Sequence, residues 1–181
     1  DKIIAEASDR VIVHNEFCFR RFGFPEKTGI IPHGATPVDT PPPPREACKR
    51  ALGIDPKIPL VGYVGFISSY KGLETLIEAM IKVPNVALLI GGGWHVERDT
   101  QYIVGLKEWT LKDLAGRCRW LGYVSDRDLS MVYGAMDVNV YPSRFSTESG
   151  ALIMALSHGK AVIASNVAPF REKEKVGALM T

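Results

Sequence analysis

The sequence contains no long hydrophobic run, and this absence excludes a membrane-spanning helix, which needs about 20 consecutive apolar residues. The first residues show no pattern of a secretory signal. Charge of one sign is also scarce: 22 Lys and Arg residues oppose 20 Asp and Glu residues, which gives a net charge of +2. Such a balance provides no basic surface for nucleic acid. We therefore expect a cytoplasmic globular protein without a nucleic-acid partner.

Cysteine is scarce as well. Cys18, Cys48 and Cys118 form an odd set whose spacing matches no metal-ligand motif. Such a set is typical of free thiols in a reducing compartment. We expect neither a disulfide framework nor a metal site.

What the sequence does have is a regular alternation of apolar strands and amphipathic helices. Of its 181 residues, 46% are hydrophobic, which is enough to bury a core. Strand and helix alternate about five times, which predicts right-handed βαβ units and an α/β fold with a Rossmann-like, doubly wound parallel sheet. The expected strands are residues 59–67, 85–93, 118–124, 137–143 and 160–165, and the expected helices are residues 73–83, 99–116, 125–136 (with Ser125 as N-cap) and 149–159.

A less regular part precedes this alternation. Two short strands are expected within residues 9–17 and 28–38, with a helix between them that ends at Gly23. The four consecutive prolines of residues 41–44 favour a polyproline II conformation. They form either a surface loop that leads to a helix over residues 45–53 or a linker between two lobes, and both interpretations are open.

In open parallel sheets, ligands bind beyond the carboxyl ends of the strands, so the loops at those ends are candidate sites. The loop of residues 68–72 contains Lys71, whose ammonium group suits a phosphate beside helix N-terminal amides. A solvated surface lysine is the competing interpretation, because the P-loop motif is absent. The glycines of residues 91–93 either turn the chain tightly or allow a ligand close to the backbone.

The loop of residues 142–150 is rich in hydroxyl groups and precedes an apolar helix. Its serines can cap that helix, and the backbone amides of residues 149–151 are expected to be free at the ligand edge. A helix N-terminus carries about half a positive charge, and Gly150 leaves room for an anion. Glu148 is the only carboxylate in the loop, and Arg144 is a second candidate for anion contact. The loop therefore fits a phosphate or a sugar oxygen, although an ordinary N-cap uses the same residue types.

Five segments follow one another in a characteristic order: IIPHGATPV, GFISSYKGLETLIEAM, VALLIGGG, RWLGYVSDRDLSMVYGAMDVNVYPS and GALIMALSHGKAVIAS. Together they resemble the C-terminal, donor-binding half of a GT-B glycosyltransferase, in particular family 4, the glycosyl transferases group 1. The first resembles the crossing between lobes, the second a lysine–glycine loop with its helix, and the third a strand that leads to a glycine turn. The resemblance covers nearly the whole chain.

This resemblance implies that the chain is one half of a GT-B fold and a piece of a longer, two-lobed protein. Residues 1–30 would be a remnant of the preceding lobe and the crossover, and residues 31–181 would form the nucleotide-sugar-binding domain. The implied activity is retaining transfer of a hexosyl group from a UDP- or GDP-linked sugar to an acceptor hydroxyl, without metal or cofactor. The implied catalytic residues are Lys71 and Glu148, and the implied donor contacts are Gly65, Ser68, Lys71, Gly92, Gly93, Tyr123, Val124, Arg144, Ser146, Ser149, Gly150 and Ala151.

The chain departs from the family pattern at two positions, eight residues apart, that usually hold glutamates. Ser146 and Met154 stand there instead. The family's second glutamate binds the nucleotide ribose and its first acts near the donor sugar, where Glu148 would partly replace it. An arginine that shares the diphosphate is also missing, since Phe66 follows Gly65. TESGALIMAL is similar to a branch of the family without the glutamate pair, and we therefore expect a transferase.

Other functions are open alongside this one. A non-catalytic GT-B-like lobe that has lost its carboxylates would bind no nucleotide, and an epimerase or phosphorylase of sugars would share the fold. A dehydrogenase is disfavoured, because no strand is followed by G-x-G-x-x-G. The acceptor, a glycan or lipid, would bind the missing N-terminal lobe, so this chain alone is expected to catalyse nothing. Glycan biosynthesis and peripheral membrane association of the whole protein are further expectations.

Overall fold

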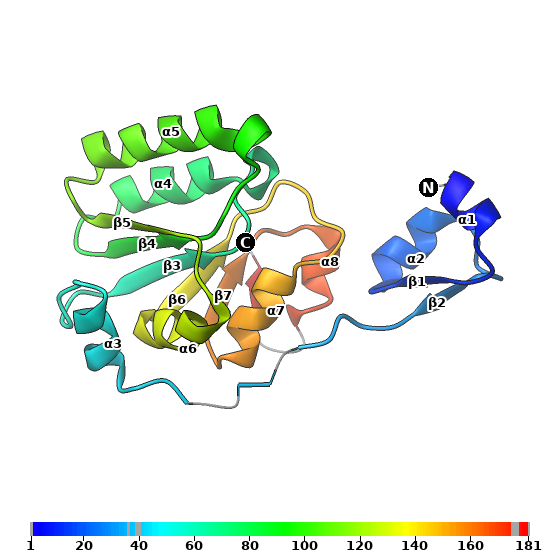
Figure 1. Ribbon diagram of the computed structural model, residues 1–181, viewed down its shortest axis with the longest axis horizontal. Coiled ribbons are helices and arrows are strands. Elements are labelled where there is room, and N and C mark those ends of the chain that lie inside the picture. Colours follow the sequence, from blue (N-terminus) through cyan, green and yellow to red (C-terminus); the bar gives the residue numbers. More distant parts are fainter. Residues whose placement is uncertain (1, 36, 39–40, 175–177, 181) are drawn as a thin grey trace.

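The computed structural model describes residues 2–35, 37–38, 41–174 and 178–180 of the chain, and its largest feature is a six-stranded parallel sheet (Figure 1). The strand order is β5-β4-β3-β6-β7-β8, and every neighbouring pair is parallel. The strands are β3 (Leu60–Val64), β4 (Ala87–Gly91), β5 (Cys118–Gly122), β6 (Val138–Tyr141), β7 (Ala161–Ala164) and β8 (Ala178–Met180).

Helices cover both faces of this sheet. Figure 1 shows α4 (Leu73–Ile81) and α5 (Val96–Asp113) on one face, with α3 (Arg45–Ala51), α6 (Asp126–Ala135) and α7 (Gly150–Ser157) on the other. The chain runs from β3 to β5 in one direction and from β6 to β8 in the other. This arrangement confirms the expected α/β, doubly wound parallel sheet. The change of direction lies between β3 and β6, where open sheets of this type bind ligands.

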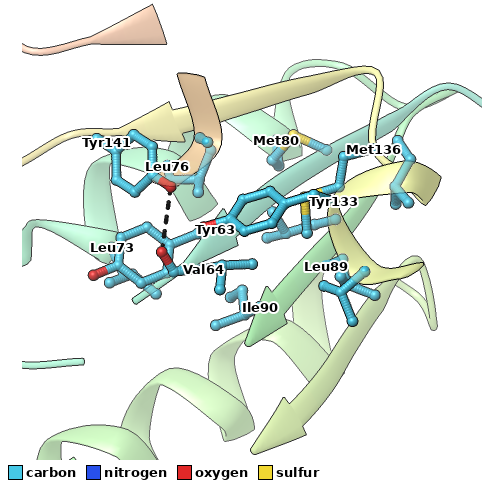
Figure 2. Close-up of a cluster of buried hydrophobic side chains, with 14 of the residues drawn as sticks. Tyr63, Val64, Leu73, Leu76, Met80, Leu89, Ile90, Tyr133, Met136 and Tyr141 are labelled. Carbon is cyan, nitrogen blue, oxygen red and sulfur yellow. Dashed lines mark hydrogen bonds between the residues drawn. The ribbon is translucent and has the colours of Figure 1, made fainter. Parts of the chain in front are cut away.

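The core forms between the sheet and the helices on each face. Leu73, Leu76, Ile77 and Met80 recur at helical spacing along α4, and all four are buried. Figure 2 shows Leu73, Leu76 and Met80 near side chains of β3 and β4. All five residues of β4 are buried, as expected for a central strand with both faces covered.

A second, smaller unit of structure precedes the connector, which is the part of the chain between residues 30 and 45. It contains the two parallel strands β1 (Val11–Val13) and β2 (Thr28–Ile30), with α1 (Lys2–Ala7) and α2 (Glu16–Phe22) (Figure 1). Asn15 caps α2 by accepting a hydrogen bond from the amide of Cys18, and Gly23 ends the helix with a φ of 80°. The last of the four prolines, Pro44, is the N-cap of α3.

Several elements differ from the sequence expectations. α5 begins at Val96 rather than at residue 99 and ends at Asp113 rather than at residue 116. Ser125 occupies the N-cap of α6, but its hydroxyl donates to the Asp128 carboxylate and accepts no hydrogen bond from a helix amide. Four short elements were not expected: α1, β8, α8 (Ala168–Arg171) and the 3₁₀ turn η1 (Ser69–Lys71). No helix within the described residues is long and apolar enough to cross a membrane.

One partly buried carboxylate, that of Asp137, bonds to several groups at the amino-terminal edge of the sheet. Asp137 accepts from Lys49 Nζ at 2.8 Å, from Arg45 Nη1 at 2.6 Å and from the Leu60 amide at 2.8 Å. Lys49 is only 2% exposed. Burial raises the pKa of Asp137, but the hydrogen bonds from Lys49 and Leu60 and the nearby positive charges outweigh it and hold this pKa below its usual range.

We therefore expect Asp137→Asn to lower the free energy of unfolding at neutral pH by about 3 kcal/mol, because it leaves the Lys49 ammonium buried without a counter-charge. Since the folded-state pKa of Asp137 is depressed, its contribution is present above the unfolded pKa of about 3.9 and is lost as the pH falls through the folded pKa. Urea unfolding of wild type and variant from pH 7 downwards tests this. A difference that stays constant into acid contradicts it.

The carboxyl ends of β3 and β4 come into close contact. The Gly65 amide donates to the Gly91 carbonyl at 3.0 Å, and the Gly92 amide donates to the Gly122 carbonyl at 2.7 Å. Gly92 has a φ of 150°, and a Cβ there would overlap the carbonyl oxygen of Gly65. Only glycine fits this position.

Gly92→Ala should accordingly lower the free energy of unfolding by roughly 3 kcal/mol, through overlap and backbone strain. The matched control is Gly105→Ala in the middle of α5, where a Cβ meets nothing within 4 Å. This second change should raise the free energy by about 1 kcal/mol, because alanine favours the helix. Equal effects of the two substitutions in denaturant titrations would be incompatible with the close approach.

Candidate functional site

A cavity of about 450 Å³ opens at the carboxyl edge of the sheet, beside the change of strand direction. Its walls come from the end of β3, the loops after β3, β4 and β5, one side of α6 and the first two turns of α7. The lining residues are Val64, Gly65, Phe66, Gly92, Gly93, Trp94, Tyr123, Val124, Leu129, Tyr133, Gly150, Ala151 and Met154.

Seven of the donor contacts expected from sequence meet in this cavity. They are Gly65, Gly92, Gly93, Tyr123, Val124, Gly150 and Ala151. The other expected site residues are not among its lining residues: Ser68, Lys71, Arg144, Ser146, Glu148 and Ser149.

Aromatic side chains stand around the cavity. Tyr123 is 78% exposed and Phe66 is 46% exposed, although large aromatic side chains are often buried in proteins. The indole of Trp94 donates to Thr100 and so is held in place by α5. Exposed rings beside glycine backbone suit the flat face of a base or sugar ring.

The contribution of α6 to the cavity was not expected from the sequence. Leu129 and Tyr133 lie one helical turn apart and reach the cavity from this helix. The sequence shows their spacing of four residues, which places them on one face of a helix. The same spacing also predicts packing into the core, so it did not identify them as cavity residues. Met154 of α7 completes this wall, at the position where the family pattern has a glutamate.

The first turn of α7 contributes Gly150 and Ala151 to the wall of the cavity. Ser149 is the N-cap, and its hydroxyl accepts from the Leu152 amide at 3.2 Å. Within the described part of the chain, the amides of Gly150 and Ala151 have no protein acceptor. The expectation of a third free amide was wrong: the Ser149 N–H donates to Glu148 Oε1 at 3.0 Å. Two amides at a helix N-terminus remain to attract an anion.

Lys71 lies in a turn next to the loop that precedes α7. The Arg144 amide donates to the Tyr70 carbonyl at 2.9 Å, which joins the two loops. The Lys71 ammonium lies 4.9 Å from the centre of the Tyr70 ring, and no carboxylate in the described residues forms an ion pair with it. Burial lowers the pKa of Lys71. An unpaired, partly desolvated cation of this kind gains most from an anionic ligand.

The remaining polar residues expected at the site have internal partners. Ser68 is buried and donates to the Asp99 carboxylate at 3.1 Å, and Arg144 lies 3.4 Å from the Glu74 carboxylate. Ser146 is buried and donates to the backbone carbonyl of Glu148. These side chains shape the loops and do not line the cavity.

Buried tyrosine hydroxyls fix the backbone of the cavity from below. Tyr141 donates to the Ala151 carbonyl at 2.8 Å. Its hydroxyl also lies 3.3 Å from the Val64 carbonyl (Figure 2). Tyr63 donates to the Phe66 carbonyl at 2.9 Å. The hydroxyl of the neighbouring Tyr133 is buried and has no hydrogen-bond partner in the described residues.

The contrast between the bonded hydroxyl of Tyr141 and the unbonded hydroxyl of Tyr133 gives a matched pair of substitutions. Tyr141→Phe should lower the free energy of unfolding by about 1 kcal/mol, because the Ala151 carbonyl loses the hydroxyl that donates to it. Tyr133→Phe removes a hydroxyl of the same kind that bonds to nothing, so its stability should stay the same or rise slightly. Thermal unfolding of both variants measures this difference in stability. A larger loss of stability in Tyr133→Phe than in Tyr141→Phe would contradict these hydrogen-bond assignments.

No three His, Cys, Asp or Glu side chains gather as a metal site anywhere in the described residues. The three cysteines are unpaired, and burial raises the pKa of Cys118 to about 12.

Known proteins resemble this chain in sequence and in fold. D-inositol 3-phosphate glycosyltransferase of Mycobacterium sp. (strain KMS) is 28% identical over 172 residues, which cover 91% of this chain and 38% of that protein. Sucrose-phosphate synthase of Thermosynechococcus elongatus has a TM-score of 0.81 at 31% identity, over 99% of this chain and 46% of that one. HepE of Anabaena, solved in complex with UDP and glucose, has a TM-score of 0.86 at 22% identity, over 99% and 51%.

The chain thus spans between 38% and 51% of the length of these relatives. Residues 58–181, from the start of β3 onwards, match the family model described as glycosyl transferases group 1. The fold agrees with this match, since the solved relatives superpose over almost the entire chain. The chain therefore belongs to the glycosyl transferases group 1 family and has the fold of one half of a GT-B glycosyltransferase.

Proposed function

We propose that this chain is the donor-binding lobe of a retaining glycosyltransferase that uses a UDP- or GDP-linked hexose. The observation that carries the proposal is the cavity itself, where exposed aromatic rings, close-packed glycines and two unpaired helix amides converge. The solved complex of the structurally similar HepE with UDP and glucose supports a nucleotide sugar as the ligand.

The parts of the donor can be assigned by chemistry. The base would lie against the backbone of Gly93, Tyr123 and Val124, where an exposed ring is available for stacking. The diphosphate would be held by the Gly150 and Ala151 amides and would attract the Lys71 ammonium. These groups would stabilise the negative charge that develops on the leaving diphosphate. Lys71 is the catalytic residue of this proposal.

The acceptor would bind outside this chain. We propose that residues 1–30 are the end of a preceding lobe that carries the site for a glycan or lipid acceptor. Two-stranded parallel sheets are not stable alone, and parallel sheets normally have both faces covered. β1 and β2 form such a pair, and Ile12 in β1 is 59% exposed. Without that lobe, the chain should bind donor and transfer nothing.

A non-catalytic lobe is the second candidate function. Two observations favour it: Ser146 is buried in a loop contact, and Met154 contributes an apolar group to the cavity where a carboxylate would bind ribose. This alternative predicts no affinity for any nucleotide, so a binding experiment separates the two.

Calorimetric titration of the chain with UDP, GDP and ADP is that experiment. We expect one of the nucleotides to bind, and Lys71→Ala to weaken it roughly tenfold or more, because a hydrogen bond to a charged group contributes about 1.5–3 kcal/mol. The control is Lys57→Ala, an exposed lysine before the amino end of β3, which should leave binding unchanged. If none of the nucleotides binds, in this chain or in the whole protein, the non-catalytic alternative holds.

The pH dependence of binding tests the role of the ammonium group. The proposed contact needs the protonated ammonium, so affinity for the nucleotide should fall as the pH rises. Because burial lowers the pKa of Lys71 in the free protein, this fall should begin at a lower pH than it would for an exposed lysine. In Lys71→Arg the cation stays charged, so the decline should disappear. The same decline in both proteins would mean that another group titrates.

A further inference from the structure

A buried network joins the N-terminus of α2 to the loop that precedes α7, across about 130 residues of sequence. Asn15, the N-cap of α2, is 2% exposed. Its amide donates to the Thr147 carbonyl at 2.6 Å and to Glu148 Oε2 at 3.2 Å. The Cys18 thiol donates to the same Thr147 carbonyl at 3.3 Å. The first turn of α2 is therefore bonded directly to this loop.

Glu148 is the centre of the network. Its side chain is 8% exposed, and Lys173 lies 3.1 Å from Oε2, the oxygen that also accepts from Asn15. The other oxygen, Oε1, accepts from the Ser149 amide. Both oxygens are thus engaged within the protein, and Glu148 is not among the residues that line the cavity.

A second carboxylate, that of Glu172, also bonds to the N-terminus of α2. Glu172, just after α8, accepts from the Glu16 amide at 3.3 Å and from the Phe17 amide at 3.2 Å. These are unpaired amides in the first turn of α2, so Glu172 caps the helix from outside. α2 also packs against α8. The backbone is thus bonded on both sides of Glu148, through the Thr147 carbonyl and the Ser149 amide.

We infer that Glu148 is a positioning residue that couples the N-terminus of α2 to the N-terminus of α7. It fixes the amide of Ser149, and Ser149 caps α7 through its hydroxyl on Leu152. The two amides that line the cavity, Gly150 and Ala151, follow immediately. The segment before the connector thereby sets the direction of the amides at the donor cavity. This role replaces the catalytic one that the sequence suggested for Glu148, and its consequence for nucleotide binding rests on the proposed function.

Asn15→Asp separates the two tasks of Asn15. Aspartate keeps the acceptor that caps α2, but it has no donor for Thr147 or Glu148 and brings a second negative charge to the Glu148 carboxylate. In the 181-residue chain, hydrogen exchange at the amides of Ser149, Leu152 and Ile153 should become roughly tenfold faster, while the Cys18 amide stays protected. Glu148→Ala should give the same acceleration at Leu152 and Ile153.

Lys49→Met is the matched control. It breaks a buried ion pair at the opposite edge of the sheet, so it lowers stability without touching the network. Exchange at the first turn of α7 should then accelerate no more than in the rest of the sheet. If Asn15→Asp and Glu148→Ala leave α7 unchanged, or if Lys49→Met accelerates α7 as much as they do, the coupling is refuted.

Titration of the same proteins with UDP and GDP separates this inference from the proposed function. Asn15→Asp should weaken nucleotide binding roughly tenfold, and Lys49→Met should leave it unchanged. If wild type binds neither nucleotide but α7 still responds in the exchange experiment, the coupling stands and the proposed donor site falls. If wild type binds and Asn15→Asp binds equally well, the coupling does not reach the cavity and the inference is overturned.

Discussion

The candidate site depends on one close contact between backbones, at the ends of β3 and β4. The amides of Gly65 and Gly92 donate to the carbonyls of the neighbouring strand ends, and no side chain separates them. This contact places the loops after β3, β4 and β5 around one space. The tyrosines beneath it, Tyr63 and Tyr141, then hold the carbonyls of the adjoining turns. The shape of the cavity therefore depends on the backbone contact at the edge of the sheet and on the buried tyrosines beneath it.

The sequence predicted five of the six strands of the large sheet, their parallel direction and most of its helices, because apolar strands and helices of period 3.6 alternate in residues 58–165. Loops at the carboxyl ends could be identified as candidate sites for the same reason. The family resemblance then supplied the individual residues, and seven of the donor contacts that it implies line the cavity. Element ends were less predictable. The start of α5 at Val96 lacks an ordinary capping residue, since the side chain of its N-cap, His95, caps nothing. α8 has only four residues and shows no periodicity.

Polar loop residues were the least predictable part. Ser68, Ser146, Glu148 and Ser149 have the composition of a ligand-binding loop, and each of them has an internal partner instead. Those partners include Asp99 and Asn15, which are distant in sequence and carry no local signal. Hydroxyls and carboxylates serve loop structure and ligand binding with the same chemistry, so only the fold shows which task each performs.

The position of α2 against α8 also constrains the order in which the protein forms. Residues 16–22 are synthesised well before Glu172, the carboxylate that caps their helix from more than 150 positions later. The two-stranded sheet of residues 11–30 is too small to persist alone. The contact between Glu172 and α2 therefore forms only after residue 172 has been synthesised and the large sheet has folded.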